Sequence, residues 1–350
     1  MTDPSETGVS TVTESTPGVA PPETAPAPPE TAPGPRDEDR LGALIAFLRQ
    51  YAVLVLFVVV FAWLSLASDA FLTVTNLMNI LNQNAPLAIV AVAGTLVIIG
   101  GGFDLSTGSM FGVASVVAAY LAVNVNPLVG LAAAPLFGAA LGLVNGLVIT
   151  ILKVHSFLAT LASSLVYSGA ALLITGGFFI AVSSQGGFTV LGRDKIGPVN
   201  LAVLAFIAFA FAMWVVLNHT RLGRYIFAVG GNEEAAILSG IRVGQVKIWT
   251  FVLSGLAAGT AGAIGVSRIA SGQPQAGEAI GLQAIAAIIL GGTSIYGGSG
   301  AIWRSIVGVY LLALIGNGFN ILNVNPFYKD LTTGLIIVSA VALSAARRPR

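Results

Sequence analysis

The sequence has no cysteine and only two histidines among its 350 residues. The lack of cysteine excludes disulfides, thiolate metal sites and cysteine nucleophiles, and two histidines leave little room for a histidine-rich metal or catalytic centre. Charged residues are also scarce, at 9% of the chain against roughly 25% in a soluble domain. The net charge is +1 and no basic cluster stands out, so we expect no nucleic-acid partner, no metal ion and no cofactor.

The sequence also lacks the motifs of a protein that supplies its own energy. It contains no GxxxxGK[ST] phosphate loop and no Gly-Lys pair at all, so we expect no ATP hydrolysis and no enzyme. Its hydrophobic segments hold no ladder of acidic residues of the kind found in proton-driven carriers. A repeated carbonyl-rich filter of the potassium-channel type is missing too.

Apolar sequence is what the chain has in abundance. Hydrophobic residues make up 55% of it, and its mean hydropathy is +0.89. These values predict an all-α polytopic membrane protein in which residues 41–350 form one transmembrane domain. We expect about ten transmembrane helices, each near the roughly 17–25 residues that cross a bilayer, some of them short or broken by Gly-rich segments. The expected spans are 45–67, 86–101, 107–123, 127–150, 158–180, 199–217, 248–267, 280–296, 302–321 and 331–346.

Residues 1–40 differ from the rest of the chain. They contain eight acidic residues, abundant Pro and Thr, and the sequence PPETAP at 21–26 and again at 28–33. Such a segment buries too little apolar surface to offset the entropy of ordering, so we expect a disordered tail. It has no apolar stretch after a basic start and is not a signal peptide. A solvated tail and a specific docking motif both remain open as its role.

Charge placement predicts the topology. With both termini in the cytoplasm, twelve Lys and Arg residues fall on the inside and four on the outside, as the positive-inside rule requires. This orientation makes the N-terminal tail cytoplasmic. It also places the polar loop 220–247 in the cytoplasm.

The loop 220–247 is the only long polar stretch between hydrophobic spans. Asn232 is a suitable N-cap, Glu233 and Glu234 follow where a helix dipole favours anions, and Gly240 is a suitable stop. We therefore expect a helix of about two turns. It is either a plain connector or a docking helix for a soluble partner. The candidate coupling residues are Gly230, Gly231, Asn232, Glu233, Glu234, Ala235, Ala236 and Gly240.

Glycine accounts for 42 residues, and two Gly-rich clusters stand out, at 98–109 and 288–300. At an offset of 190 residues Gly101 matches Gly291 and Gly102 matches Gly292, as a diverged duplication would. Gly-interrupted spans in two halves indicate a transport pathway, because irregular backbone at membrane depth needs protein or a water-filled cavity around it. The candidates for this path are Gly101, Gly102, Asp104, Ser106, Asn145, Gly291, Gly292 and Asn317.

Two kinds of candidate have a simpler alternative. Asp104 is an acid beside membrane-embedded glycines and is a functional candidate for that reason. It is also suited to N-cap a helix starting at Leu105, by accepting a backbone N–H from Ser106 or Thr107. Asparagines in spans, here Asn145 and Asn317, more commonly hydrogen-bond neighbouring helices than line a path.

These motifs resemble a known family. The stretches GGFDLSTGS (101–109), NGLVITILKVHSFLATL (145–161), TRLGRYIFAVGGNEEAAILSGIRV (220–243) and AIAAIILGGTSIYGGSGAI (284–302) are similar to the permease subunits of bacterial monosaccharide ABC importers of the ribose, xylose and galactose type. The resemblance covers about residues 45–345. The family usually has Pro where this chain has Ser156, and an acidic Glu-Leu-Asp run where it has Gly281–Gln283.

The resemblance implies a homodimeric permease domain in the bacterial cell membrane. A separate ATP-binding subunit would dock on the loop 220–247, where the Glu-Glu-Ala-Ala core would transmit its closure to the spans, and an extracytoplasmic sugar-binding protein would deliver the substrate. The alternatives are a stand-alone carrier or facilitator, an ABC permease for a non-sugar or autoinducer-like substrate, and a non-transporting scaffold. The sequence leaves open which sugar is carried.

Overall fold

The computed structural model describes residues 37–182, 186–325, 327–328, 331–332, 334–335 and 338. The chain divides into two compact units, Met1–Phe47 and Leu48–Arg350. Residues 1–36 of the expected tail lie outside the described residues, as does most of the expected span 331–346. Both remain predictions.

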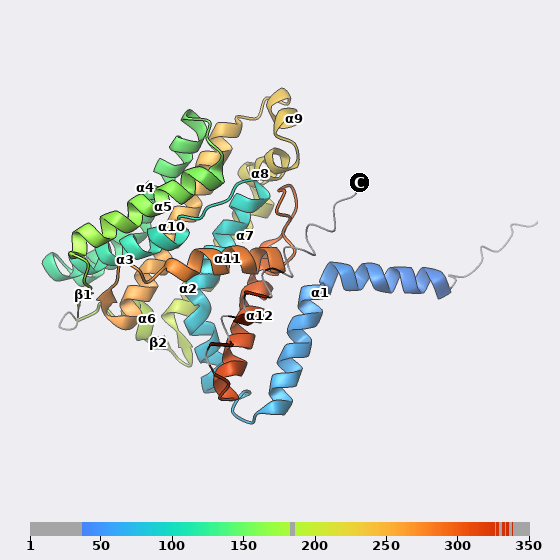
Figure 1. Ribbon diagram of the computed structural model, residues 1–350, viewed down its shortest axis with the longest axis horizontal. Helices are drawn as coiled ribbons and strands as arrows, with labels where there is room; N and C mark the ends of the chain where they lie inside the picture. The colour runs from blue at the N-terminus through green and yellow to red at the C-terminus, as the bar shows by residue number, and fades with distance from the viewer. Residues whose placement is uncertain are drawn as a thin grey trace, which may run out of the picture. The chain divides into compact units, whose positions relative to one another are not determined.

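The described chain is almost entirely helical (Figure 1). Its helices are α1 (Asp37–Ala67), α2 (Val74–Ile99), α3 (Thr107–Asn124), α4 (Pro127–Ile151), α5 (Ser156–Thr175), α6 (Val190–Arg193), α7 (Leu201–His219), α8 (Arg221–Gly231), α9 (Glu233–Leu238), α10 (Val243–Ile269), α11 (Glu278–Leu290) and α12 (Ile302–Ile321). Two antiparallel pairs of two-residue strands complete the fold, β1 (Ile180–Ala181) with β4 (Ser271–Gly272) and β2 (Lys195–Ile196) with β3 (Val199–Asn200).

Within the described residues, seven helices are long and apolar enough to cross a membrane: α2, α3, α4, α5, α7, α10 and α12. Two shorter apolar helices, Tyr51–Ala67 and α11, add to them. The backbone of α1 departs from helical geometry at Tyr51 (φ −113°, ψ 16°). The predicted all-α polytopic fold is confirmed.

Most predicted spans match a helix, and the span 302–321 coincides with α12. The span 86–101 was wrong at its start, because α2 begins twelve residues earlier at Val74. Thr73 caps this end, where its Oγ1 accepts the backbone N–H of Asn76 at 3.3 Å. The polar run after Val74 resembles a loop in sequence, but Asn76 exchanges two hydrogen bonds with Asn317 of α12, at 2.8 and 3.2 Å. A tertiary contact therefore stabilises a helical segment whose composition argues against it.

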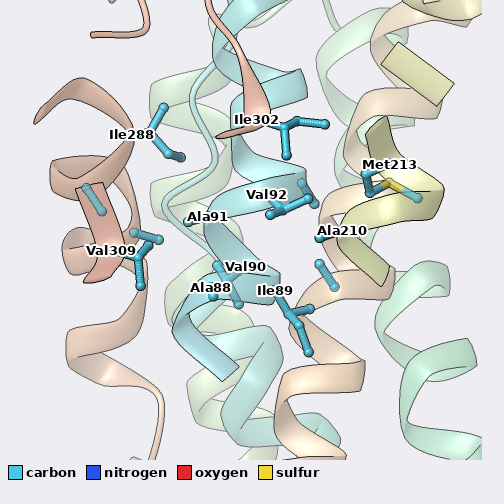
Figure 2. Packing of buried hydrophobic residues seen from close by; sticks show 14 of the residues in the cluster. Ala88, Ile89, Val90, Ala91, Val92, Ala210, Met213, Ile288, Ile302 and Val309 are labelled. Atoms are coloured by element: carbon cyan, nitrogen blue, oxygen red, sulfur yellow. The ribbon is translucent and has the colours of Figure 1, made fainter. Parts of the chain in front are cut away.

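Helix α2 forms the core of the second unit, and its second half is buried on all sides. Figure 2 shows Ile89 and its neighbours on α2 between residues of α7, α11 and α12. Met213 comes from α7, Ile288 from α11 and Val309 from α12. Because α2 is buried by other helices along this half, it is the central element around which they pack.

Helices α4 and α10 pack backbone against backbone. In α4, Gly138, Gly142 and Gly146 recur every four residues along one face. A Cβ added at Gly138 would overlap the carbonyl oxygen of Gly255 in α10, and one at Gly142 would overlap that of Phe251. This is the small-residue packing by which helices associate in lipid. The glycines of α4 are thus explained by close approach.

This packing predicts the effect of a larger side chain. Gly142→Val should destabilise the protein by about 1–3 kcal/mol, because the valine side chain would collide with the α10 backbone. Gly169→Val in α5 is the matched control, because a Cβ there meets no atom within 4 Å. Thermal unfolding in detergent measures the difference. Equal stability of the two variants would contradict the packing described here.

Candidate functional site

The polar loop 220–247 contains two helices. The predicted short helix is α9, where Asn232 Oδ1 accepts the backbone N–H of Ala235 at 2.9 Å. Gly240 follows the helix with a φ of +79°, a left-handed conformation that glycine adopts without strain. The predicted cap and stop are both confirmed. Sequence reasoning missed α8, although its buried residues Ile226 and Val229 lie three apart on one helical face.

Side chains of α9 divide into an anchored and an exposed set. Glu233 binds Lys247 of α10 through both carboxylate oxygens, at 2.7 and 2.8 Å from Nζ. Ala236 is buried at 4% exposure, whereas Ile237 and Leu238 are 56% and 89% exposed. The ion pair and Ala236 hold α9 against the body of the unit. The apolar tip of α9 is left facing outward.

The two Gly-rich clusters contain the same helix ending. After α2, Gly101 adopts a left-handed φ of +80° and the N–H of Gly102 bonds the carbonyl of Val97 at 2.9 Å. After α11, Gly292 has φ +86° and the N–H of Thr293 bonds the carbonyl five residues back at 3.2 Å. Both are Schellman motifs. The structural match therefore pairs Gly101 with Gly292, one residue further than the offset of 190 read from the sequence.

We call the segments that follow these two helix ends, residues 100–106 and 291–301, the first and the second break. Both breaks meet the end of α8 at one point. The N–H of Gly298 donates to the carbonyl of Ile99 at 2.8 Å, and a Cβ at Gly230 would overlap the same carbonyl oxygen. A Cβ at Gly297 would lie 3.1 Å from the Cα of Gly101. We call Ile99, Gly101, Gly230, Gly297 and Gly298 the glycine junction. The sequence identified all three segments separately, but nothing in it indicated that they touch.

Past the first break, the chain is held by a buried polar network. Asp104 Oδ1 accepts from the backbone N–H of Ser106 at 3.0 Å and from its Oγ at 2.6 Å. Its Oδ2 accepts from Ser254 Oγ of α10 at 2.8 Å. The bond predicted from Ser106 to Asp104 is present, but α3 begins at Thr107 rather than at Leu105. All three partners donate, which suits a carboxylate that can only accept.

The network continues into α4 and α5. Asn145 Nδ2 donates to Ser106 Oγ at 2.7 Å, and its Oδ1 accepts from Tyr167 of α5 at 2.9 Å. The backbone N–H of Phe103 bonds Ser156 Oγ at 3.0 Å, also from α5. Asn145 therefore links helices, as does Asn317 through its bonds to Asn76. Irregular backbone needs such partners inside a membrane.

The remaining path candidates are three glycines, two of which are closely packed. A Cβ at Gly102 would lie 3.2 Å from the Val97 side chain, and one at Gly291 would lie 2.5 Å from the carbonyl oxygen of Arg304. Gly292 has open space around it but a left-handed backbone.

In the part of the chain that the structure describes, no cluster of three or more His, Asp or Glu side chains is arranged to hold a metal ion.

Comparisons with known proteins agree with this architecture. Residues 76–341 match the family model described as branched-chain amino acid transport system / permease component. The chain is 40% identical to the ribose import permease protein RbsC of Escherichia coli (strain K12) over 302 residues, covering 85% of this chain and 94% of that protein. It is 39% identical to RbsC of Bacillus subtilis (strain 168), covering 80% of this chain and 87% of that protein. The comparison with solved structures found no match.

A third relative, the galactose/methyl galactoside import permease protein MglC of Escherichia coli (strain K12), is 33% identical over 87% of this chain and 97% of its own length. The helical fold and these matches define a permease component of a bacterial membrane transport system. More narrowly, the chain belongs to the carbohydrate ABC importer permeases, the family of RbsC and MglC. It is the membrane subunit of such an importer and not itself an enzyme. Membership implies ATPase and binding-protein partners.

The buried network predicts the effect of removing one donor. Ser254→Ala should destabilise the protein by about 2 kcal/mol, because a buried acceptor oxygen of Asp104 loses its hydrogen bond. Thr260→Val on the same helix is the control, because Thr260 Oγ1 only donates to the carbonyl of Leu256 in its own helix. Thermal unfolding of the purified variants measures both. A Ser254→Ala protein as stable as the control would mean that Asp104 does not depend on this bond.

Proposed function

We propose that two copies of this chain form the membrane pore of an importer that carries a monosaccharide into the cytoplasm. An extracytoplasmic sugar-binding protein delivers the substrate, and a separate ATPase docks on α9. The observation that carries the docking assignment is the apolar tip of α9, where Leu238 is 89% exposed on a helix that is capped and braced. The homodimer follows from the family resemblance.

The substrate class rests on the relatives. They include import permeases for ribose and for galactose and methyl galactoside, an L-arabinose ABC transporter permease and a D-allose transport system permease. These are pentoses and hexoses with several hydroxyl groups. A monosaccharide is therefore the substrate that the comparisons favour for this chain.

The arrangement of cationic residues supports a cytoplasmic α9. Arg221 and Arg242 belong to the segment around α8 and α9, and Arg304 lies in the first turn of α12, which follows the glycine junction. Arg193 and Arg268 meet at the end of α10 that is opposite to α9, where Arg193 Nε bonds the carbonyl of Arg268 at 2.8 Å. The larger number of cations near α9 agrees with the positive-inside rule and with termini in the cytoplasm.

The surface beside α9 is suited to a protein partner. A groove of about 430 Å³ lies between α8 and α10, and Tyr225 and Trp249 line it. These two aromatic residues are 41% and 55% exposed. Together with Ile237 and Leu238 they present apolar and aromatic groups of the kind that dominate protein interfaces. An ATPase surface that receives the tip of α9 would cover them.

Alternating access would couple ATP binding to transport. Binding of ATP would draw together the two ATPases and the α9 helices docked on them, and the path would open toward the loaded binding protein. The ATPase can shift the equilibrium between the two conformations only by the difference between its affinities for them. Of the path candidates, Gly101, Gly292 and the backbone beside them lie at the helix breaks, where a modest rotation changes the direction of α3 or α12.

The exposed leucine gives a direct test. Leu238→Asp should abolish copurification of the ATPase from detergent-solubilised membranes and abolish uptake of labelled ribose, arabinose, allose and galactose, because a charge would be desolvated in the interface. Leu238→Met keeps the apolar tip and should behave as wild type. Uptake that persists in Leu238→Asp without bound ATPase would favour the stand-alone carrier. If the wild-type importer transported none of the four sugars, this result would count against a monosaccharide as the substrate.

The ion pair of α9 gives a second test. Glu233→Lys should impair coupling, because two cations would then face each other between α9 and α10. The double variant Glu233→Lys/Lys247→Glu restores the pair with reversed charges and should recover uptake. The measurement is the initial uptake rate at equal protein level. Failure of the double variant to recover would indicate that Glu233 contacts the ATPase directly rather than bracing α9.

A further inference from the structure

We propose that the glycine junction transmits movement of the docked ATPase to both broken segments of the membrane domain, with Gly230 as the positioning residue. The proposal rests on the assignment of α9 as the docking helix. The family resemblance placed transmission in the Glu-Glu-Ala-Ala core of α9. The geometry points instead to the contact that lies just before this helix in the sequence.

Gly230 is close to the docking helix in the chain. It lies in the last turn of α8, and only Gly231 and the cap Asn232 separate it from the first residue of α9. The backbone runs through the cap without a flexible insertion, because the N–H of Asn232 bonds the carbonyl of Ala228 at 3.1 Å. Movement of α9 is therefore passed directly to the end of α8.

One carbonyl group connects α8 to both breaks. The oxygen of Ile99, in the last residue of α2, accepts the N–H of Gly298, which belongs to the segment between α11 and α12. A Cβ at Gly230 would overlap this oxygen, so one Cα hydrogen of Gly230 points at it. Displacing Gly230 must therefore displace the end of α2, the segment before α12, or both.

The contact is suited to transmission because no flexible side chain intervenes. Backbone atoms of three segments touch, and packed backbones do not deform continuously. Ile226, one turn earlier in α8, is fully buried and approaches Gly100, whose Cβ would lie 3.7 Å from its Cγ2. This anchor keeps α8 against the end of α2, so the helix moves with the break.

The adjacent glycine provides the contrast. The sequence made Gly231 a coupling candidate, but a Cβ at Gly231 meets no atom within 4 Å and its φ is not in the left-handed region, so the structure gives a side chain at this position no part in the junction. Gly230→Ala should therefore disturb the junction while Gly231→Ala should not, although the two residues are neighbours in the same helix turn. A general effect of alanine on helix α8 would be the same in both.

The test uses the complete importer reconstituted in proteoliposomes with its ATPase and binding protein. Gly230→Ala should still copurify with the ATPase and hydrolyse ATP, but the number of sugars transported per ATP should fall by at least about fivefold, the lower end of typical coupling factors. This ratio does not depend on how much protein folds. Gly231→Ala should keep the wild-type ratio.

The outcomes separate the two proposals. Copurification together with a wild-type ratio in Gly230→Ala would overturn the role of the junction and leave the docking assignment intact. Failure of the wild-type chain to bind an ATPase would overturn the docking assignment itself. If Gly230→Ala does not assemble, Ile226→Ala decides, because it loosens the anchor of α8 without a collision. A wild-type ratio in Ile226→Ala would overturn the proposal, and a reduced ratio would support it.

Discussion

Buried backbone groups that leave a helix must find partners within the protein, and this constraint shapes the whole domain. Two segments depart from helical geometry next to the core helix α2, residues 100–106 and 291–301. Each begins with a Schellman motif, which satisfies the last carbonyls of the helix before it. The other helices must then supply the remaining partners. The arrangement of α3, α4, α5, α8 and α10 around the first break follows from this need.

The first break is supported in two different ways along its length. Residues 103–106 are fixed by side chains, because Ser156, Thr160, Asn145 and Ser254 hydrogen-bond to them from three helices. Gly101 instead meets glycine backbone from α8 and from the segment before α12. The polar part is thus locked to the body of the domain. Gly101 is in contact with α8, which leads to α9, so movement of α9 reaches the end of the break to which the side chains of α4, α5 and α10 do not hydrogen-bond.

Local patterns were enough to predict the elements but not their meeting points. The cap at Asn232, the stop at Gly240 and the bounds of α12 all follow from neighbouring residues, and each was predicted correctly. The start of α2 was predicted wrongly because Asn76 is stabilised by Asn317, which lies 241 positions away. Helix α8 was not predicted because its Gly-rich sequence obscures a short amphipathic face. The glycine junction brings together residues from three distant segments, and glycines carry no side chain whose chemistry would reveal a partner.

Ser156 shows how a departure from the family can be compensated in place. The resemblance to sugar permeases leads one to expect proline there, at the first position of α5, where proline suits the fixed backbone geometry of a helix start. Serine lacks that rigidity, but its Oγ accepts the N–H of Phe103 at 3.0 Å inside the domain. The serine hydroxyl thus accepts a backbone N–H of the irregular segment. Proline has no side-chain oxygen and could not accept this hydrogen bond. This hydrogen bond joins the start of α5 to the first break. The rigidity that is lost without proline is therefore offset by a bond to a backbone group that has no helical partner.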